Sequence, residues 1–338
     1  MQYKIALAKC QAKINFPRVN MKRTFIALLF CGIAFRSVAA ADDRVRISYA
    51  SRSISAILVF IANDKGFFKE EGLEPQLILT RGTTAIAAAV AGDIEAVHIM
   101  GSAIRGIIQG LPLKVLAVNQ KLPLFWLVTR PELKSFADLK GKTMAVTTFG
   151  GSQQLAGFHM LRKGGIDPVK EITSIVSGDV PAQLQAQVSG PVQITVLSPP
   201  TAFVARDRYK LNLLTSTGDD YINFISGLIV SERTLREKPT VIKRTLRALT
   251  KANRFFHSNE TASAEILAKY LNVSQPIALE TYRYSLPSYT RNGIPTDKEL
   301  EEHLKSDAQF LQLKTPIKSS AVFDLSLQRE VNNELGVK

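Results

Sequence analysis

Hydrophobic and polar positions along residues 45–230 switch repeatedly between two spacings. Short segments with alternating or continuous apolar residues, such as 45–50 and 114–119, predict strands, and apolar residues at helical spacing between them, such as those of 54–61, predict helices. Glycines and prolines separate these segments, so the turns are a few residues long. Strands are predicted at 45–50, 75–79, 95–100, 114–119, 124–129, 143–147, 172–176, 194–197 and 224–230. This alternation predicts a parallel sheet with helices on both faces.

The chain is predicted to leave a first α/β unit along 124–129 and to return to it along 224–230. Helices then dominate, at 231–257, 261–271, 275–285, 297–311 and 320–333. Two crossing segments predict two hinged lobes, the first made of 42–128 plus 225–338 and the second of 129–224. Because ligands of open α/β sheets bind at the carboxyl ends of strands, the cleft between the lobes is the predicted site.

Composition excludes several classes of protein. The 338 residues are 46% hydrophobic and 21% charged, which is typical of a globular protein of about two domains and not of a disordered chain. Of the 43 basic residues, seven lie in 1–41, where no acidic residue occurs. The remaining charges are mixed in sign, without the basic stripe and reading motif of a nucleic-acid-binding protein. We therefore interpret them as solvated surface.

The first 41 residues have the pattern of an export signal. Met21-Lys22-Arg23 is followed by an apolar run over 24–35 and by small residues over 37–41, which predicts a signal peptide at 21–41, cleaved after Ala40 or Ala41, and a periplasmic protein. Residues 1–20 are interpreted as sequence upstream of the working start. Phe30 before Cys31 disfavours a lipid anchor. The sequence also contains no run of about 20 apolar residues, the length that a bilayer-spanning helix needs.

Both cysteines, Cys10 and Cys31, lie within this predicted leader. The chain after it therefore has no disulfide, no thiol nucleophile and no cysteine ligand for a metal. Four histidines, at positions 98, 159, 257 and 303, show no metal-binding spacing, and no nucleophile elbow, phosphate loop or HExxH motif occurs. We therefore expect no metal, no cofactor and no enzymatic activity.

Six segments in a fixed order give the chain a family resemblance: Gly66 to Glu74, Ala91 to Glu95, Gly110 to Val115, Phe136 to Lys142, Gly150 to Ser152, and Leu197 to Pro200. The chain resembles periplasmic solute-binding proteins of the nitrate/sulfonate/taurine type, which share their fold with thiamine-pyrimidine synthesis proteins. The resemblance implies a type II periplasmic binding fold, with two Rossmann-like mixed-sheet lobes joined by two crossing strands. It also implies a monomer that delivers a small solute to the permease and ATPase of an ABC importer.

One segment departs from the family pattern. Where the family has an Asp-Ala pair before a strand, this chain reads Gly190 to Thr195, with Gln193 and no acidic residue. That contact is therefore not carried over to this chain. Either the ligand or only the local turn differs.

The candidate ligand-binding residues follow predicted strands. Gly150, Gly151, Ser152 and Gln153 open a helix, where free N–H groups favour an anionic group, although Ser152 could simply cap that helix. The 81–84 segment likewise places a glycine and two hydroxyl residues after a strand and at a helix start. Here too, the alternative is that these residues only cap the helix. Arg52 could pair with a carboxylate or sulfonate, or lie in solvent. The full set is Ser51, Arg52, Ser53, Gly82, Thr83, Thr84, Gly101, Ser102, Gly150, Gly151, Ser152, Gln153, Pro199, Thr201 and Tyr221.

Two aromatic residues at the lobe crossing, Phe125 and Trp126, could form a wall of the site or an apolar hinge core. Other functions also remain open: a secreted sensing subunit for a membrane kinase or another transporter, and a pyrimidine-synthesis-like enzyme. The enzyme alternative is disfavoured because the cysteine-rich segments of those relatives are missing. An anionic organic or inorganic solute bound by hinge closure is the function that the sequence favours.

Overall fold

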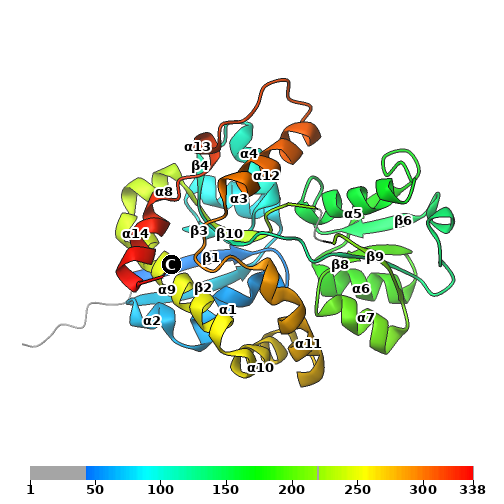
Figure 1. Ribbon diagram of the computed structural model, residues 1–338, viewed down its shortest axis with the longest axis horizontal. Helices are drawn as coiled ribbons and strands as arrows, with labels where there is room; N and C mark the ends of the chain where they lie inside the picture. Colours follow the sequence, from blue (N-terminus) through cyan, green and yellow to red (C-terminus); the bar gives the residue numbers. More distant parts are fainter. Residues whose placement is uncertain (1–42, 219–220, 338) are drawn as a thin grey trace, which may run out of the picture. The chain divides into compact units, whose positions relative to one another are not determined.

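Two five-stranded sheets organise the computed structural model, which describes residues 43–218 and 221–337 (Figure 1). The first sheet has the order β2-β1-β3-β10-β4, and β1 pairs in parallel with β2 and β3, whereas β10 runs antiparallel to β3 and β4. Its strands are β1 (Asp43–Tyr49), β2 (Leu73–Leu79), β3 (Ala96–Val97), β4 (Leu113–Gln120) and β10 (Ser226–Ser231).

The second sheet repeats this arrangement, with the order β7-β6-β8-β5-β9. Strand β6 pairs in parallel with β7 and β8, and β5 runs antiparallel to β8 and β9. Its strands are β5 (Trp126–Thr129), β6 (Thr143–Val146), β7 (Thr173–Val176), β8 (Ile194–Leu197) and β9 (Asn212–Ser216). We call the region around the first sheet the first lobe and the region around the second sheet the second lobe; both belong to one contiguous unit, Asp42–Lys338.

Helices cover both faces of each sheet, as Figure 1 shows. In the first lobe, one face packs against α1 (Ile57–Asp64), α9 (Pro239–Ser258), α10 (Glu260–Leu271) and α11 (Gln275–Ser285). Its other face packs against α3 (Gly82–Ala91), α4 (Gly101–Ile108) and α12 (Asp297–Phe310). In the second lobe, α5 (Ser152–Lys163) covers one face, and α6 (Val180–Ser189) and α7 (Thr201–Tyr209) cover the other.

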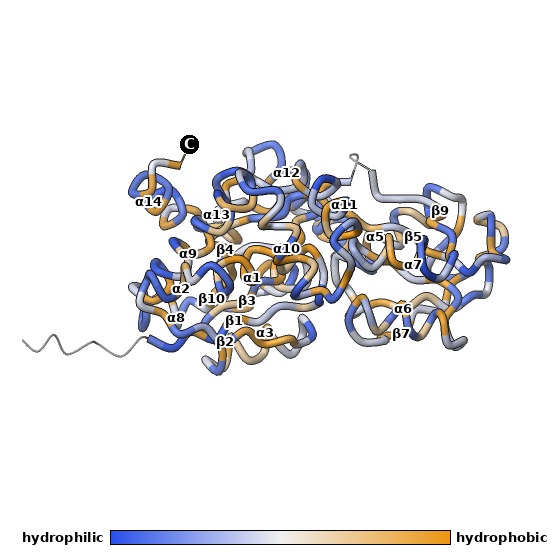
Figure 2. The backbone as a smooth tube through the Cα atoms, turned by 90° about the horizontal axis from the view of Figure 1, so that it is seen from below, coloured by the Kyte–Doolittle hydropathy of each residue, from blue (hydrophilic) through white to orange (hydrophobic). Residues whose placement is uncertain are grey.

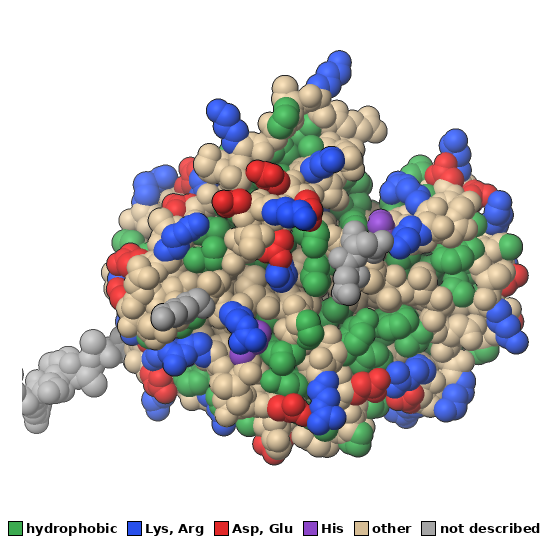
Figure 3. Space-filling model, in the orientation of Figure 1, with side chains coloured by type: hydrophobic (Ala, Val, Ile, Leu, Met, Phe, Trp, Pro, Cys, Tyr) green, Lys and Arg blue, Asp and Glu red, His purple; other side chains and the backbone are tan. Residues whose placement is uncertain are grey.

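Shorter elements complete the chain: η1 (Ile54–Ala56), α2 (Phe67–Glu70), η2 (Phe136–Leu139), α8 (Glu232–Glu237), η3 (Leu286–Ser288), α13 (Ser319–Val322) and α14 (Ser326–Leu335). The hydrophobic stretch of α1, visible in Figure 2, is fully buried from Ile57 to Ala62. On the face drawn in Figure 3, Lys and Arg side chains lie among Asp and Glu side chains, and no large one-sign patch forms there. Within the described residues, no helix is long and apolar enough to cross a membrane.

The predicted fold class, two mixed α/β lobes, is confirmed by the two five-stranded mixed sheets. Several details of the predicted elements differ in the structure. Each sheet contains one antiparallel strand, which the family resemblance implied but the alternation of strands and helices did not. The edge strand β9 is not among the predicted strands, and β3 is only two residues long. The predicted helix 231–257 is split in two at Lys238, because the residue before Pro239 is excluded from the helical region. The predicted leader, residues 1–41, lies outside the described residues.

Candidate functional site

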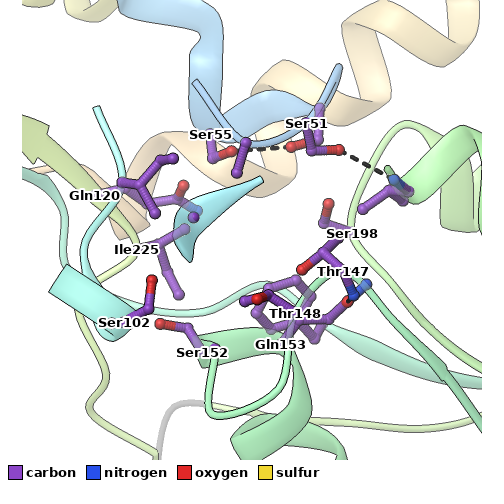
Figure 4. Close-up of a pocket in the computed structure, with 18 of the residues that line it drawn as sticks. Ser51, Ser55, Ser102, Gln120, Thr147, Thr148, Ser152, Gln153, Ser198 and Ile225 are labelled. Atoms are coloured by element: carbon purple, nitrogen blue, oxygen red, sulfur yellow. Dashed lines mark hydrogen bonds between the residues drawn. The ribbon is translucent and has the colours of Figure 1, made fainter. Parts of the chain in front are cut away.

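A pocket lies where the parallel strands of both sheets end (Figure 4). Ser51 follows β1, Thr147 follows β6 and Ser198 follows β8, so the carboxyl edges of the two sheets face the same space. The space open to the centres of water-sized molecules is about 80 Å³. Since one water needs roughly 10–15 Å³ by this measure, the pocket has room for a small solute.

Three helices begin at this pocket with free amide groups. Gly82 opens α3, Gly101 opens α4 and Ser152 opens α5, and all three line the pocket. None of the three helices has a side-chain hydrogen bond at its N-cap. Their first N–H groups and the positive ends of their dipoles therefore favour a ligand with negative charge or strong acceptor atoms.

Helix α6 also begins here but is already capped. Its N-cap Asp179 accepts a hydrogen bond from Ala182 N at 3.2 Å, and Val180 N donates to Ser51 Oγ at 3.2 Å. The N–H groups at this helix start therefore already have acceptors within the protein, unlike those of the three uncapped helices.

Hydroxyl and amide groups form most of the polar lining. Figure 4 shows Ser51 and Ser55 facing Thr147, Thr148 and Ser198 across the pocket, and Ser102 close to Ser152. Ser102 Oγ and Gln120 Oε1 are buried atoms without a hydrogen-bond partner among the described residues. Because a buried polar atom without a partner is costly, both atoms favour a ligand or water that hydrogen-bonds them.

Gln153 is used to build the site. Its Oε1 accepts from Thr147 N at 2.6 Å, and its Nε2 donates to Val196 O at 2.5 Å and to Gln183 Oε1 at 2.9 Å. These bonds fix the loop after β6 and leave Gln153 little capacity to hydrogen-bond a solute.

Among the described residues, Arg81 is the one lining residue that is charged at neutral pH, and no described Asp or Glu lines this pocket. Its side chain is exposed and has no hydrogen bond or ion pair within the described part of the chain. The other titratable lining residue, His98, is 3% exposed, and burial lowers its pKa to about 4. The pocket therefore presents one positive charge and a neutral imidazole.

The buried histidines predict a loss of stability in acid. Burial lowers the pKa of both His98 and His303 to about 4, whereas an unfolded histidine titrates near 6.5. Between these values the unfolded chain binds protons that the folded chain does not. The free energy of unfolding should therefore fall as the pH falls from 6.5 to 4, at up to ~1.4 kcal/mol per pH unit for each histidine. Urea unfolding of His98→Gln at pH 6.5, 5.5 and 4.5 should show a shallower slope than that of the wild type; an unchanged slope would contradict the assignment.

Eight predicted site residues line the pocket: Ser51, Ser53, Gly82, Gly101, Ser102, Gly151, Ser152 and Gln153. The other seven, Arg52, Thr83, Thr84, Gly150, Pro199, Thr201 and Tyr221, are outside the lining. Thr83 and Gly150 instead border a neighbouring groove. The N-cap of α5 is Gly151, and the Ser152 hydroxyl donates to Phe224 O at 3.4 Å, so Ser152 does not cap its helix.

Arg52 and Tyr221 make other contacts. Arg52 Nε lies 3.1 Å from Asp179 Oδ2, so its guanidinium already has a carboxylate partner. Tyr221 stacks on His159 with ring centroids 4.5 Å apart. Phe125 lines the pocket, whereas the indole of Trp126 packs near Tyr284.

The structure adds lining residues that were not among the predicted site residues: Ser55, Arg81, His98, Gln120, Thr147, Thr148 and Ser198. Most lie within two residues of the carboxyl end of a strand. That position is the signal that could have identified them. Ser55 could not be found in this way, because it lies within η1 and not directly after a strand.

Several contacts join the lobes around the pocket. Val180 N donates to Ser51 Oγ, Ile54 N donates to Pro199 O at 3.2 Å, and Arg52 pairs with Asp179. Helix α5 is held against the connection to β10 by the bond from Ser152 to Phe224 O. The pocket is thus enclosed by both lobes in this arrangement.

Residues 54–262, more than half of the chain, match the family model described as NMT1/THI5 like. The chain belongs to this family. Among curated relatives, a putative binding protein of Brucella abortus (strain 2308) is 24% identical over 260 residues, covering 75% of this chain and 80% of the relative. The putative binding protein YtlA of Bacillus subtilis (strain 168) is 24% identical over 270 residues, covering 76% and 80%.

Solved structures share the fold of this NMT1/THI5-like chain. The periplasmic nitrate-binding protein NrtA from Synechocystis PCC 6803 has a TM-score of 0.72 at 18% identity, covering 87% of this chain and 89% of that chain. The alkanesulfonate-binding protein SsuA from Xanthomonas axonopodis pv. citri, bound to MOPS, has a TM-score of 0.70 at 17% identity, covering 84% and 99%. The desulfurization enzyme DSZB also matches, with a TM-score of 0.65 at 19% identity, covering 87% and 99%. The fold therefore occurs in binding proteins and in an enzyme.

Proposed function

We propose that this family member is the extracytoplasmic solute-binding component of an ABC importer and captures a small anionic solute between its two lobes. One observation carries the proposal: three uncapped helix starts and Arg81, which has no partner among the described residues, surround a pocket that no described carboxylate lines. Each of these features favours negative charge, and they come from both lobes.

The relatives support this choice of function. The curated relatives are named as putative binding proteins, and two solved structures of the same fold bind nitrate and alkanesulfonates. Their importer context provides the proposed partners, a permease and an ATPase, and the proposed periplasmic location. An anion with a head group of nitrate or sulfonate size would fit among the Ser and Thr hydroxyls of the pocket.

Binding would act by population shift. A solute that contacts Gly82 and Ser102 in the first lobe together with Ser152 in the second makes all of these contacts only when the lobes are closed. Its binding free energy therefore favours the closed arrangement, which the permease would recognise.

We propose binding without catalysis because the polar lining consists of hydroxyls, amides, one arginine and a neutral, buried histidine. Such groups can hold an anion by hydrogen bonds. They do not form the pairing of a nucleophile with an adjacent base that covalent catalysis requires. Among the described residues, no group of three or more His, Cys, Asp and Glu could hold a metal ion.

A thermal-unfolding panel tests the proposal. The full chain is heated with nitrate, methanesulfonate, taurine, MOPS, and choline as a cationic control. A solute that binds only the folded state should stabilise it by about 2.7 kcal/mol at one hundred times its dissociation constant. We expect a saturable rise of the melting temperature with at least one anion and none with choline. No saturable shift with any anion, or a shift with choline alone, would contradict anion binding.

Arg81→Ala should weaken binding of the responding anion about tenfold, because an exposed charge-assisted hydrogen bond contributes roughly 1.4 kcal/mol. The matched control is Arg233→Ala, which removes an exposed arginine on α8, outside the pocket lining. Titration calorimetry should give the control the wild-type affinity. Equal affinities for the Arg81 variant and the wild type would remove Arg81 from the site.

A further inference from the structure

Arg105 on α4 is a buried cation outside the pocket lining. Its side chain is 5% exposed, and Nη1 donates to Asp307 Oδ1 of α12 at 2.5 Å. The Asp307 side chain is fully buried. Since both partners belong to the first lobe, this ion pair holds the guanidinium in one place and neutralises its charge.

The pair is connected to the segment that returns from the second lobe. His303 on α12 accepts a hydrogen bond from Phe224 N at Nδ1, 3.1 Å away, and its Nε2 lies 3.4 Å from Asp307 Oδ2. The His303 ring stacks on Phe224 with centroids 4.4 Å apart. Residues of α4, α12 and the connection before β10 thus form one buried network.

The free end of the guanidinium reaches the second lobe. Arg105 Nη2 donates to Gly150 O, and Gly150 N in turn donates to Gln154 Oε1 at 2.7 Å. Gly150 has a φ of +66°, a backbone conformation that glycine adopts without strain. It lies directly before Gly151 and Ser152, where α5 starts at the pocket. The position of this carbonyl therefore fixes the position of one anion-binding helix start.

We propose that Arg105 is a positioning residue that latches the two lobes closed without touching the solute. Asp307 holds the guanidinium in the first lobe, and the remaining N–H group finds a charge-assisted acceptor in Gly150 O only when the lobes meet. The latch gives the protein a closed population before any solute binds. The inference rests on the proposed function in treating closure as the step that captures the solute.

The distance between the lobes tests the latch directly. Because the described chain has no cysteine, spin labels are introduced at Lys170 in the second lobe and Lys298 in the first, whose side chains are 82% and 84% exposed. The full chain carries Cys10→Ser and Cys31→Ser in addition. Pulsed electron spin resonance then measures the label distances without any solute, and the structure gives the distance expected for the closed arrangement.

Arg105→Lys is the main variant, because one ammonium keeps the charge beside Asp307 but lacks the fork that reaches both acceptors. Arg52→Lys is the matched control, since Arg52 also joins the lobes through Asp179 but is 54% exposed. We expect a closed fraction in the wild type, a loss of at least threefold in Arg105→Lys, and no change in Arg52→Lys. Absence of a closed fraction in the wild type, or its retention in Arg105→Lys, overturns the latch.

A second variant covers the case in which Arg105→Lys does not fold. Gln154→Met removes the acceptor of Gly150 N, so the Gly150 peptide is no longer held with its carbonyl toward Arg105. The ion pair of Arg105 and Asp307 stays intact, and the closed fraction should therefore fall here too. An unchanged closed fraction in Gln154→Met overturns the proposal. Since these measurements use no solute, a failed anion panel contradicts the proposed function and leaves the test of the latch intact.

Discussion

Replacing Gly101 with alanine is expected to weaken binding of the responding anion by about 10- to 100-fold while changing the free energy of unfolding little. Gly101 opens α4 in the first lobe and faces the start of α5 in the second. A Cβ atom there would lie 2.1 Å from Ser152 Oγ and 3.0 Å from Ser152 N. The first of these contacts forces the Ser152 hydroxyl to move away, and the second requires the backbone at the start of α5 to shift.

The size of the effect follows from where the clash falls. Overpacking costs about 1–3 kcal/mol in protein interiors. Here the main clash is with the other lobe, so the cost applies to the closed arrangement and is relieved by opening. The apparent affinity falls with the fraction of molecules able to close, and each ~1.4 kcal/mol is a factor of ten. The added methyl group also approaches Arg105 Nη2, at 2.7 Å, and so disturbs the latch in the same direction.

Gly157→Ala is the matched control, because its Cβ would lie 2.7 Å from Val196 Cγ2 within the second lobe alone. It should lower the melting temperature and leave the affinity of the folded protein near the wild-type value. Titration calorimetry and thermal unfolding of both variants separate the two outcomes. If Gly101→Ala binds the anion like the wild type, the lobes do not meet at this position in the bound protein.

The hydrophobic pattern predicts most of the elements but not the direction of every strand. An apolar run such as that of β10 is compatible with either direction, and only pairing with β4 makes it antiparallel. Strand β9 was missed because it is a half-buried edge strand with polar residues at Asn212, Thr215 and Ser216. Two-residue β3 is shorter than its apolar run because the chain turns toward α4 after Val97.

Predicting the site from sequence succeeds where local structure determines the position. Ser51 follows β1, and Gly82 and Gly151 lie at the helix starts that follow β2 and β6, so the topology alone brings all three to the pocket. Sequence reasoning offered Arg52 as a candidate cation of the site, but the structure pairs it with a carboxylate 127 positions away, whereas Arg81 lies in the lining without a partner among the described residues. No local pattern reveals such a partner, and the same holds for Arg105 and Asp307, which are 202 positions apart.

Removing the Asp307 carboxylate should produce the largest loss of stability. Asp307→Leu leaves Arg105 as a buried, unpaired cation, and breaking a buried ion pair in this way typically costs about 3–5 kcal/mol. Replacing both partners, as in Arg105→Met with Asp307→Leu, removes both charges and should restore most of that loss. Urea unfolding at pH 7.5 measures the free energies of unfolding of Asp307→Leu, of Arg105→Met and of the double variant.

An exposed pair provides the scale for this cycle. Arg233 and Glu237 on α8 lie 2.9 Å apart with both side chains more than half exposed, and Glu237→Ala should change the free energy of unfolding by less than about 0.5 kcal/mol. A loss for Asp307→Leu as small as that of Glu237→Ala would mean that water reaches Arg105 in the folded protein. A double variant as unstable as Asp307→Leu would instead locate the loss in packing around α12, because no unpaired charge remains. If the double variant regains stability but no longer populates the closed arrangement, the ion pair is needed to hold Arg105 toward Gly150 and not to keep the chain folded.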